Sequence, residues 1–560
     1  MSKNLAETAP VVRWMNSISW VIILFLTMGV PARTVAQSQE SFRGMLTARD
    51  RSLTPAPPAH LQAYVKDGKI SLSLRDAILL TLENSSSIVI QETQIESQKF
   101  NLLAAFQNFD PYISSQLNLN RYSSPTYSQL QGVGTSNGAA NSLSQSGWVS
   151  YTQAFTPGTS FVGTISSNRS STNSAYNYFN PYYSSTLNFQ FTQPLLRNGG
   201  KFANTAPIHI ARRSLQQSRA LFEAQVNDDV LQAINQYWSV VQARATLDVQ
   251  KKSYHLAELS YDHDKRALDL GALSPLDIYR SQAEVASRKV TVIQAENSLS
   301  QAEDALRVLI GADQDPSYRA LDLDLTEKPE PQEELENVVL DSALAEALNG
   351  RPEMSAEQDA LAKDEIGIRL AHNQLKPNLS LSGFYQSSGL GGNQYDLTTG
   401  KLLVPGGFGA SYDQVFGFGY PGYGGSLTLQ LPVKNRASQA ALGSALVGRT
   451  RDLYNDRLLR EQITQEVSDA VHHLNETKMA LDAGTASYDL AQKSLAADQR
   501  KYELGAETNF FVLDSQSRLA QAELTLLQTQ IEYQVAVATV HHATGSLLDT
   551  YRVQVAELSK

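Results

Sequence analysis

The same pattern of elements occurs twice in this chain. Ala343 to Pro377 repeats the helix, proline and alternating strand of Ala77 to Pro111, with both ends displaced by 266 positions. After each copy come a long polar stretch, a second alternating strand that ends in proline, and a very long helical region. Because an internal repeat constrains architecture more strongly than any single motif, we predict one unit built from two similar halves. The prolines at the predicted strand and helix junctions are Pro111, Pro194, Pro377 and Pro432.

The segments around the predicted strands contain almost no charge. Residues 111–200 and 378–433 hold three charged side chains each, in a chain that is 18% charged. Both segments are rich in tyrosine, and apolar and polar residues alternate in strands such as Leu187 to Thr192. A soluble β-sandwich gives the same alternation, but it usually places lysine or glutamate on its wet face. The pattern therefore favours a barrel wall with lipid outside and water inside.

Two helical regions of unusual length follow the strands. Residues 211–270 contain neither proline nor glycine, and residues 438–504 form the counterpart. Each region ends at a glycine, Gly271 or Gly505, and a second helical pattern follows. Narrow apolar stripes on helices of this length need other helices as partners, so we predict two antiparallel coiled-coil hairpins. The stripes comprise Val226, Val230, Ile234, Tyr237 or Trp238 and Val241 in the first helix, and Ile463, Val467, Val471 and Leu474 in the second.

The amino terminus has the pattern of an export signal. Lys3 and Arg13 precede an apolar run from Trp20 to Val30, and a small-residue cleavage site at Thr34 to Ala36 follows. An uncleaved amino-terminal anchor is the alternative. The apolar run is too short to cross a bilayer as a helix. Loss of residues 1–36 makes an already acidic chain more acidic, which excludes a nucleic-acid binder as a reasonable class.

Composition also narrows the chemistry. The chain has no cysteine, which excludes disulfides, thiolate metal sites, a cysteine nucleophile and a lipidated amino-terminal cysteine. We find no phosphate-binding glycine loop, no HExxH motif and no convincing catalytic constellation. We therefore predict a protein that is not an enzyme and has no cofactor.

The layout resembles the TolC-like outer membrane efflux proteins. The resemblance covers Ile70 to Leu547 and is carried by LSLRDAILLTLENS, by the proline-ended strands FTQPLLRNGG and LQLPVKN, and by the turns LGALSPLDI and LGAETNFFVLDSQ. It implies an α+β membrane protein that forms a homotrimer. In that family each chain gives four strands to a twelve-stranded outer-membrane β-barrel, continued by a hollow α-helical coiled-coil periplasmic tunnel. It also implies two partners, a periplasmic adaptor (membrane fusion) protein and an inner-membrane pump.

These signals divide the chain into predicted segments. A signal peptide (1–36) and an N-terminal tail (37–69) precede repeat 1 (70–310), whose strands and loops span 111–195 and whose helical hairpin spans 204–310, with a tip near 271. An acidic, proline-bearing linker (311–337) leads to repeat 2 (338–547). There the strands and loop span 378–432 and the helical hairpin spans 434–546, with a tip near 505. Residues 548–560 form a C-terminal tail.

One segment departs from the family pattern. Val149 to Phe155 and Phe161 to Ile165 alternate like strands and are joined across Pro157 and Gly158. We interpret them as an extended extracellular hairpin, with a contribution of six barrel strands per chain as the alternative. Residues 389–424, rich in glycine and tyrosine, would be the matching extracellular loop of the second half.

The hairpin tips are the predicted aperture. In the family an aspartate six residues after the first tip glycine bonds a tyrosine three residues before the second, and a basic residue joins them. Asp277 and Tyr502 match this pattern, whereas Glu507 stands where the basic residue would be. Arg280, one turn after Asp277, could replace that charge on a helix surface. The resemblance thus implies a latch at the tips whose charge pair is altered in this chain.

The family also carries an acidic ring at the periplasmic mouth, made by two aspartates in the second tip. Only Asp514 matches, and Phe511 stands in place of the other aspartate. Three copies of Asp514 around an axis would attract cations, while Phe511 would narrow the mouth with apolar bulk. The alternative is that Asp277 and Asp514 are solvated charges near helix starts.

Four histidines support a separate hypothesis. His472 and His473 precede the second tip by about as many residues as His541 and His542 follow it, so the two pairs should lie at similar height. Paired imidazoles could bind a metal or respond to pH. Solvated or packed histidines are the alternative, since no carboxylate or cysteine with ligand spacing accompanies them.

Together these observations predict an outer-membrane exit duct that extends into the periplasm. It would serve a tripartite efflux or type I secretion system and passively conduct small molecules or polypeptides, gated at the tips. An exported coiled-coil structural or adhesive envelope protein is the main alternative.

Overall fold

The computed structural model describes residues 60–128, 131–133, 138–270, 278–331, 335–504 and 506–553. The chain divides into Met1–Ala59 and His60–Lys560, and all described residues belong to the second unit. The predicted signal peptide (1–36) and the first part of the predicted N-terminal tail lie outside the described residues.

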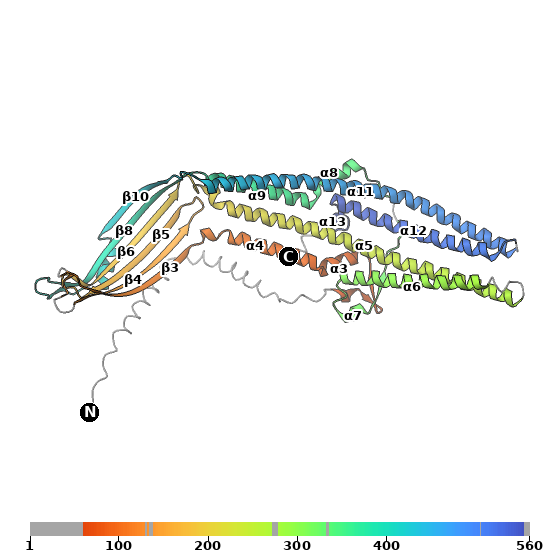
Figure 1. Cartoon of the computed structure of the whole chain (residues 1–560), viewed down its shortest axis with the longest axis horizontal. Coiled ribbons are helices and arrows are strands. Elements are labelled where there is room, and N and C mark those ends of the chain that lie inside the picture. The colour runs from red at the N-terminus through yellow and green to blue at the C-terminus, as the bar shows by residue number, and fades with distance from the viewer. Residues whose placement is uncertain are drawn as a thin grey trace, which may run out of the picture. The chain divides into compact units, whose positions relative to one another are not determined.

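Six long strands form one antiparallel sheet at one end of the second unit (Figure 1). Their order is β10, β8, β6, β5, β4 and β3, and the three-residue β9 (Leu402–Val404) pairs with β8 off this path. Strands β3 and β10 therefore form the two edges of the sheet. The bounds are β3 (Tyr112–Pro125), β4 (Ala139–Ala154), β5 (Ser160–Thr172), β6 (Phe179–Pro194), β8 (Asn378–Tyr395) and β10 (Pro421–Gln430).

The hairpin of β4 and β5 corrects a sequence-based expectation. Both strands lie inside the sheet between β3 and β6, so each chain places six long strands in this sheet and not the four that were expected. The turn of this hairpin also lies at the helical end of the sheet, because the Gly200 N–H donates to the Pro157 carbonyl at 3.1 Å. An extracellular hairpin is therefore wrong as well. Serine and glycine, as at Gly147 and Ser166, had diluted the alternation and hidden the full length of both strands.

The strand register places apolar residues on one face of the sheet. Phe161 pairs with Phe191, and Leu381 pairs with Leu427, all on the same face. The opposite face carries polar uncharged residues such as Asn188, which pairs with Gln386. Several apolar side chains on the first face are open in the single chain: the exposed fraction is 74% for Leu117 and 65% for Leu427. A face of this kind needs lipid or another apolar surface.

Two helical hairpins extend from the sheet (Figure 1). In the first, α5 (Lys201–Asp269) is followed by α6 (Ile278–Leu309), and in the second, α11 (Arg436–Glu503) is followed by α12 (Asn509–Thr544). A pair of shorter helices precedes the strands in each half of the chain. These pairs are α3 (Leu74–Asn84) with α4 (Ser86–Ala104), and α8 (Leu340–Gly350) with α9 (Pro352–Gln374).

The core follows the predicted stripes of the long helices. Val226, Val230 and Ile234 of α5 are fully buried in a cluster that also contains residues of α3, α4 and α12. Ile463 and Val467 of α11 are buried in a second cluster with residues of α8, α9 and α12. The predicted apolar stripes are therefore confirmed as core positions.

A small mixed region flanks the middle of the first hairpin. Strand β2 (Lys69–Leu72) pairs antiparallel with β1 (Val65–Lys66) and parallel with β7 (Asp322–Leu325), which belongs to the predicted linker. A 3₁₀ helix (Leu61–Tyr64) and α7 (Pro316–Arg319) flank this sheet in the chain, so residues 61–69 of the predicted tail are ordered. The chain continues after α12 into α13 (Leu547–Thr550).

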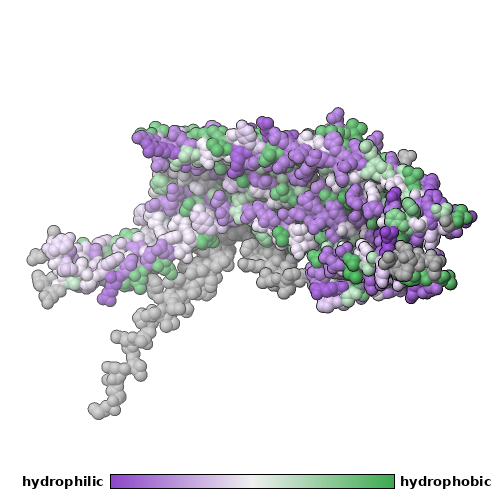
Figure 2. All heavy atoms as spheres, turned by 45° about the vertical axis from the view of Figure 1, so that its right-hand side comes forward, coloured by the Kyte–Doolittle hydropathy of each residue, from purple (hydrophilic) through white to green (hydrophobic). Residues whose placement is uncertain are grey.

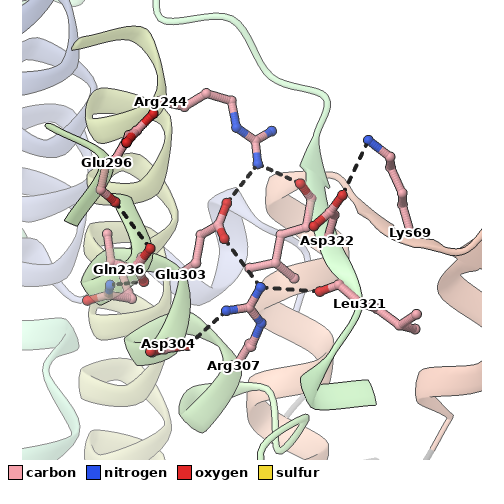
Figure 3. A network of polar contacts seen from close by, with 12 residues as sticks. Lys69, Gln236, Arg244, Glu296, Glu303, Asp304, Arg307, Leu321 and Asp322 are labelled. Carbon is pink, nitrogen blue, oxygen red and sulfur yellow. Dashed lines mark hydrogen bonds and ion pairs between the residues drawn. The ribbon is translucent and has the colours of Figure 1, made fainter. Parts of the chain in front are cut away.

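Arginines of the first hairpin hold this region (Figure 3). Arg244 of α5 and Arg307 of α6 both donate to the Glu303 carboxylate at 3.2 Å. Each arginine also donates to a linker carbonyl, Arg244 to Leu323 at 2.5 Å and Arg307 to Leu321 at 3.2 Å. The linker is thus bound to the hairpin by charged donors rather than by packing alone.

No helix among the described residues has the length and apolarity needed to span a bilayer. On the face seen in Figure 2, the strongly hydrophilic colour is more continuous over the helices than over the sheet. This distribution agrees with the low charge of the strand segments.

Candidate functional site at the helical tips

The two hairpins meet near their tips, which form the candidate site. Three of the predicted tip residues, Gly271, Asp277 and Gly505, lie outside the described residues. The predicted bond between Asp277 and Tyr502 therefore stays a prediction. The ends of α5 and α11 and the starts of α6 and α12 are described.

A buried carboxylate joins the two hairpins. Asp264, near the end of α5, has an exposed fraction of 5%. Its oxygens accept from the Ser281 hydroxyl of α6 and from Asn509 Nδ2 of α12, the latter at 2.9 Å. Asn509 Nδ2 also lies 3.0 Å from the Ser260 hydroxyl, one turn earlier on α5. One amide of the second hairpin therefore satisfies a buried charge of the first, and its loss would leave that charge short of a donor.

Tyr502 makes a second bond between the hairpins. Its hydroxyl lies 3.0 Å from His263 Nδ1, and the two rings pack edge to face with centroids 5.6 Å apart. Burial raises the pKa of the Tyr502 hydroxyl, and the nearby Asp264 carboxylate raises it further. The hydroxyl thus stays protonated, and able to donate, beyond the ordinary tyrosine range.

Two predicted charges of the tips have partners other than those expected. The Glu507 carboxylate pairs with Lys501 Nζ at 2.8 Å, within the second hairpin. The Arg280 guanidinium lies over the Phe510 ring, 5.2 Å from its centroid. Arg280 therefore contacts the second hairpin through a cation–π interaction. Neither group takes part in the bonds that Asp264 and Tyr502 make.

The predicted mouth residues lie at the start of α12. Phe511 has an exposed fraction of 48% and packs edge to face on Phe510, with ring centroids 5.5 Å apart. The Asp514 carboxylate accepts from Arg518 at 2.8 Å, one turn later on the same helix. Arg518 therefore places a positive charge beside the carboxylate that Asp514 would bring to an acidic ring.

The second tip repeats part of the first. The Ser515 hydroxyl of α12 donates to the Asp498 carboxylate of α11 at 2.5 Å, and the two residues are 17 positions apart, as are Ser281 and Asp264. Both pairs are related by the same offset of 234 positions. The bond from Ser515, and one from Lys501, lower the pKa of the Asp498 carboxyl below its usual range.

The described residues thus include a sheet with one apolar face at one end and, at the other end, two hairpin tips linked by hydrogen bonds. The model of the outer membrane efflux protein family matches residues 150–312 and 343–546, which is more than half of the chain. The chain belongs to this family.

Known members are similar to this chain over more than half of its length. Outer membrane protein TolC of Vibrio cholerae is 22% identical over 340 residues, which cover 61% of this chain and 73% of that protein. The probable efflux pump outer membrane protein TtgC of Pseudomonas putida is 21% identical over 317 residues, covering 56% of this chain and 60% of that protein. The crystal structure of the CmeC outer membrane channel of Campylobacter jejuni superposes with a TM-score of 0.59 at 14% identity, covering 91% of this chain and 94% of that chain.

Membership of the outer membrane efflux protein family places the chain in the outer membrane, with its helices in the periplasm. The family consists of channels, and the long helices with a sheet at one end agree with the fold of the CmeC channel. The resemblance noted from the sequence is thereby confirmed.

The four candidate histidines lie far from the tips, and three of them have acidic neighbours. His542 bonds Asp228 at 2.8 Å, His541 lies 3.2 Å from Glu336, and His473 lies 3.6 Å from Glu476. His473 and His542 line one cavity of about 580 Å³, as their predicted height requires, and both His472 and His473 are exposed. Within the described residues, no three histidine, aspartate or glutamate side chains are grouped closely enough to hold a metal ion. Arg351, bonded to Glu353 and Glu466, lines the same cavity with a cation.

The sequence patterns did not identify the residues that bind the two hairpins together: His263, Asp264, Ser281 and Asn509. A signal was present for Asp264, because Val249, Ser253 and Ala257 recur every four residues on the buried stripe and Asp264 lies on its continuation. An acidic residue on a buried stripe needs a partner. No comparable signal marked Asn509, which lies at the first position of α12.

Proposed function

We propose that three copies of this chain form a passive exit duct of a tripartite efflux or type I secretion system. The observation that carries the proposal is the combination of an apolar-faced sheet, whose two edges are unpaired among the described residues, with two helical hairpins joined at their tips, in a chain of the outer membrane efflux protein family. The duct would pass small molecules or polypeptides across the periplasm and the outer membrane.

The sheet edges support assembly from several copies. Strands β3 and β10 each have a strand on one side only among the described residues. Lipid cannot satisfy the free N–H and C=O groups of an edge strand, so a membrane sheet must close. A second copy offers the matching edge, β10 against β3. Six strands from each of three chains make an eighteen-stranded barrel rather than the twelve-stranded one first expected.

The tip contacts support gating. In this chain the latch between hairpins consists of Asp264 with Asn509 and of His263 with Tyr502. These are few, directional bonds, which break at modest cost when another protein competes for them. Arg280, Glu507, Phe511 and Asp514 would shape the mouth around the latch, and Asp277, outside the described residues, stays a predicted member.

Partners follow from the exposed helix surfaces of the tips. A periplasmic adaptor protein with its own helical hairpin would dock against them by helix-in-groove packing, and an inner-membrane pump would deliver cargo. Because Asp514 is paired with Arg518, we expect weaker cation selectivity than an unpaired acidic ring gives. Nothing in this function requires catalysis or a cofactor. The alternative, a coiled-coil structural or adhesive envelope protein, loses ground because it does not explain the unpaired apolar sheet.

Single-channel conductance of the reconstituted protein tests the proposal. The latch variant combines Tyr502→Phe with Asn509→Ala, and the matched control makes the same chemical changes on an exposed part of α11, Tyr454→Phe with Asn455→Ala. We expect small steps from the wild type and the control, and larger steps from the latch variant. Equal steps from all three proteins would overturn the latch. Absence of conductance in every form, in a protein that needs no detergent, would overturn the duct.

A further inference from the structure

One short helix packs on the apolar face of the sheet, although it lies in a predicted loop. Helix α10 (Phe408–Phe416) contacts β8 and β6. Its contacts involve Ser185 and Ser387, which share a face with Leu187 and Leu381 because alternate residues of a strand point the same way. This is the face that membership of the family and the residue pattern assign to lipid.

The apolar face of the sheet carries serine and glycine residues that fit closely against α10. The Ser387 hydroxyl donates to the Val415 carbonyl at 2.7 Å, and the Ser185 and Ser411 hydroxyls lie 2.9 Å apart. Ser185 and Ser387 are almost fully buried, although serine on a lipid-facing wall would otherwise be unsatisfied. At Gly389 a Cβ would overlap the Ser411 carbonyl, so only glycine permits the approach. Polar residues interrupt the apolar face where α10 covers them.

The strand register gives the height of this helix. Strand β10 has ten residues, about the number that a tilted strand needs to cross a bilayer, and its first residue, Pro421, pairs with Ser387. The residues of β8 that contact α10 begin at Ser387 and continue to Gly389, away from the helical end of the sheet. The helix therefore lies where the strands leave the hydrocarbon on the far side of the membrane from the periplasm.

The surface that α10 and its following turn present to the outside is mostly aromatic, with one exposed carboxylate, Asp413, a turn before Phe416. Phe416 has an exposed fraction of 54%, and Phe418 and Tyr420 are also exposed. Phe418 packs near Tyr385 of the lipid face, with ring centroids 6.2 Å apart. Aromatic rings at this depth are typical of the boundary between acyl chains and headgroups.

We propose that α10 is a membrane-interface helix that lies on the outside of the barrel and inserts Phe416 and its aromatic neighbours into the outer leaflet of lipid. The occupant of its exposed face is lipid because Phe418 of the following turn packs near Tyr385 of the lipid-facing wall, and a carboxylate such as Asp413 costs little at the membrane interface. The helix would fix the height of the barrel in the membrane. The inference rests on the outer-membrane location and does not require the gating proposed for the tips.

Tryptophan fluorescence in lipid vesicles tests the inference on the full-length reconstituted protein. Trp148 lies on the polar face of β4, where its Nε1–H donates to Gln116. Replacing Trp14, Trp20 and Trp148 by phenylalanine leaves Trp238, in the helical core, as a constant signal. The test variant adds Phe416→Trp to this background, and a positive control adds Leu429→Trp, on the apolar face of β10. Native Trp148 serves as the control for water.

We expect lipids brominated near the headgroup to quench the new signal of Phe416→Trp to an extent comparable with Leu429→Trp, and acrylamide to quench it less than native Trp148. Quenching by acrylamide alone would overturn the inference and place α10 in the water of the duct or above the membrane. If Leu429→Trp also escapes the brominated lipid, the lipid-facing assignment of the whole wall is wrong and the inference falls with it. Conductance in the same vesicles shows separately whether the duct has formed.

Discussion

The two hairpin tips share one serine–aspartate hydrogen bond and differ in the second partner of the aspartate. In each, a serine at the start of the returning helix bonds an aspartate near the end of the long helix, and the separation of 17 residues is the same. Asp264 of the first tip is buried and is completed by Asn509 of the other hairpin. Asp498 of the second tip is more open and is completed by Lys501 of its own hairpin.

This difference assigns different roles to the tips. The first tip depends on the second, because a buried carboxylate loses a partner whenever the hairpins separate. The second tip is self-sufficient, and its ion pairs are screened by water and salt. A partner protein that draws the hairpins apart therefore works mainly against Asp264 and leaves the second tip intact.

Asn509→Ala should have the largest effect and would break the comparison most directly. It leaves the Asp264 carboxylate buried with one side-chain donor fewer, at a cost of about 2 kcal/mol in the local opening free energy. We expect faster hydrogen exchange in residues 255–269, with residues 489–503 little changed. Equal acceleration in both segments would mean that the tips are not distinct.

Tyr502→Phe should have the next largest effect. It removes the bond to His263, worth about 1 kcal/mol, and leaves the ring packing in place. Because the folded-state pKa of Tyr502 is raised, its contribution is complete below the unfolded value near 10 and is lost as pH rises through the folded value. Exchange at the first tip should therefore accelerate above this range in the wild type, and the Tyr502-dependent part of that acceleration should vanish in the variant.

Lys501→Gln should have a smaller effect, confined to the second tip. It removes the ion pairs with Asp498 and Glu507, both of which are open to solvent screening. We expect a modest acceleration of exchange in residues 489–503 that disappears in high salt. An effect that survives high salt, or that reaches residues 255–269, would show that the second tip is not self-sufficient.

Acidification should have the smallest effect and would sharpen the comparison. The pKa of Asp498 is lowered by its bond to Ser515, so its contribution is present above the ordinary aspartate value and is lost only as pH falls through the depressed folded value. The second tip should therefore keep its slow exchange to a pH below the ordinary aspartate range. In Ser515→Ala this protection should end at a higher pH; an unchanged profile would contradict the assigned cause.

Much of the fold could be predicted because the internal repeat indicates two similar halves and the apolar periodicity indicates the helices and strands. The stripes at Val226 and Ile463 identified the long helices and their buried sides. The strands of the β4 and β5 hairpin could be predicted, but their place in the sheet could not. The repeat offset nevertheless contained a signal for the extra strands. The repeat offset is 266 positions before the strands and 234 after them, and the missing 32 positions are close to the length of that hairpin.

The site was less predictable for a physical reason. Tyr502 was found because the family pattern names it, but its partner His263 lies on another hairpin, 239 residues away in sequence. Side-chain pairs between distant helices depend on the rotation and stagger of each helix, which periodicity leaves open. The partner of Glu507 could not be predicted because Lys501, six residues earlier, lies across a turn whose path the sequence does not give.

The extra hairpin also changes the proportions of the assembled duct. It adds two strands to each chain in the sheet and no helix to the tunnel. In the proposed trimer an eighteen-stranded ring, about 35 Å across against about 25 Å for twelve strands, sits on the same number of long helices as a ring of twelve would. The passage would therefore be wider in the barrel than in the helical tunnel. The turn at Pro157 would lie at the junction of the two. Selection by size would then fall to the periplasmic end alone.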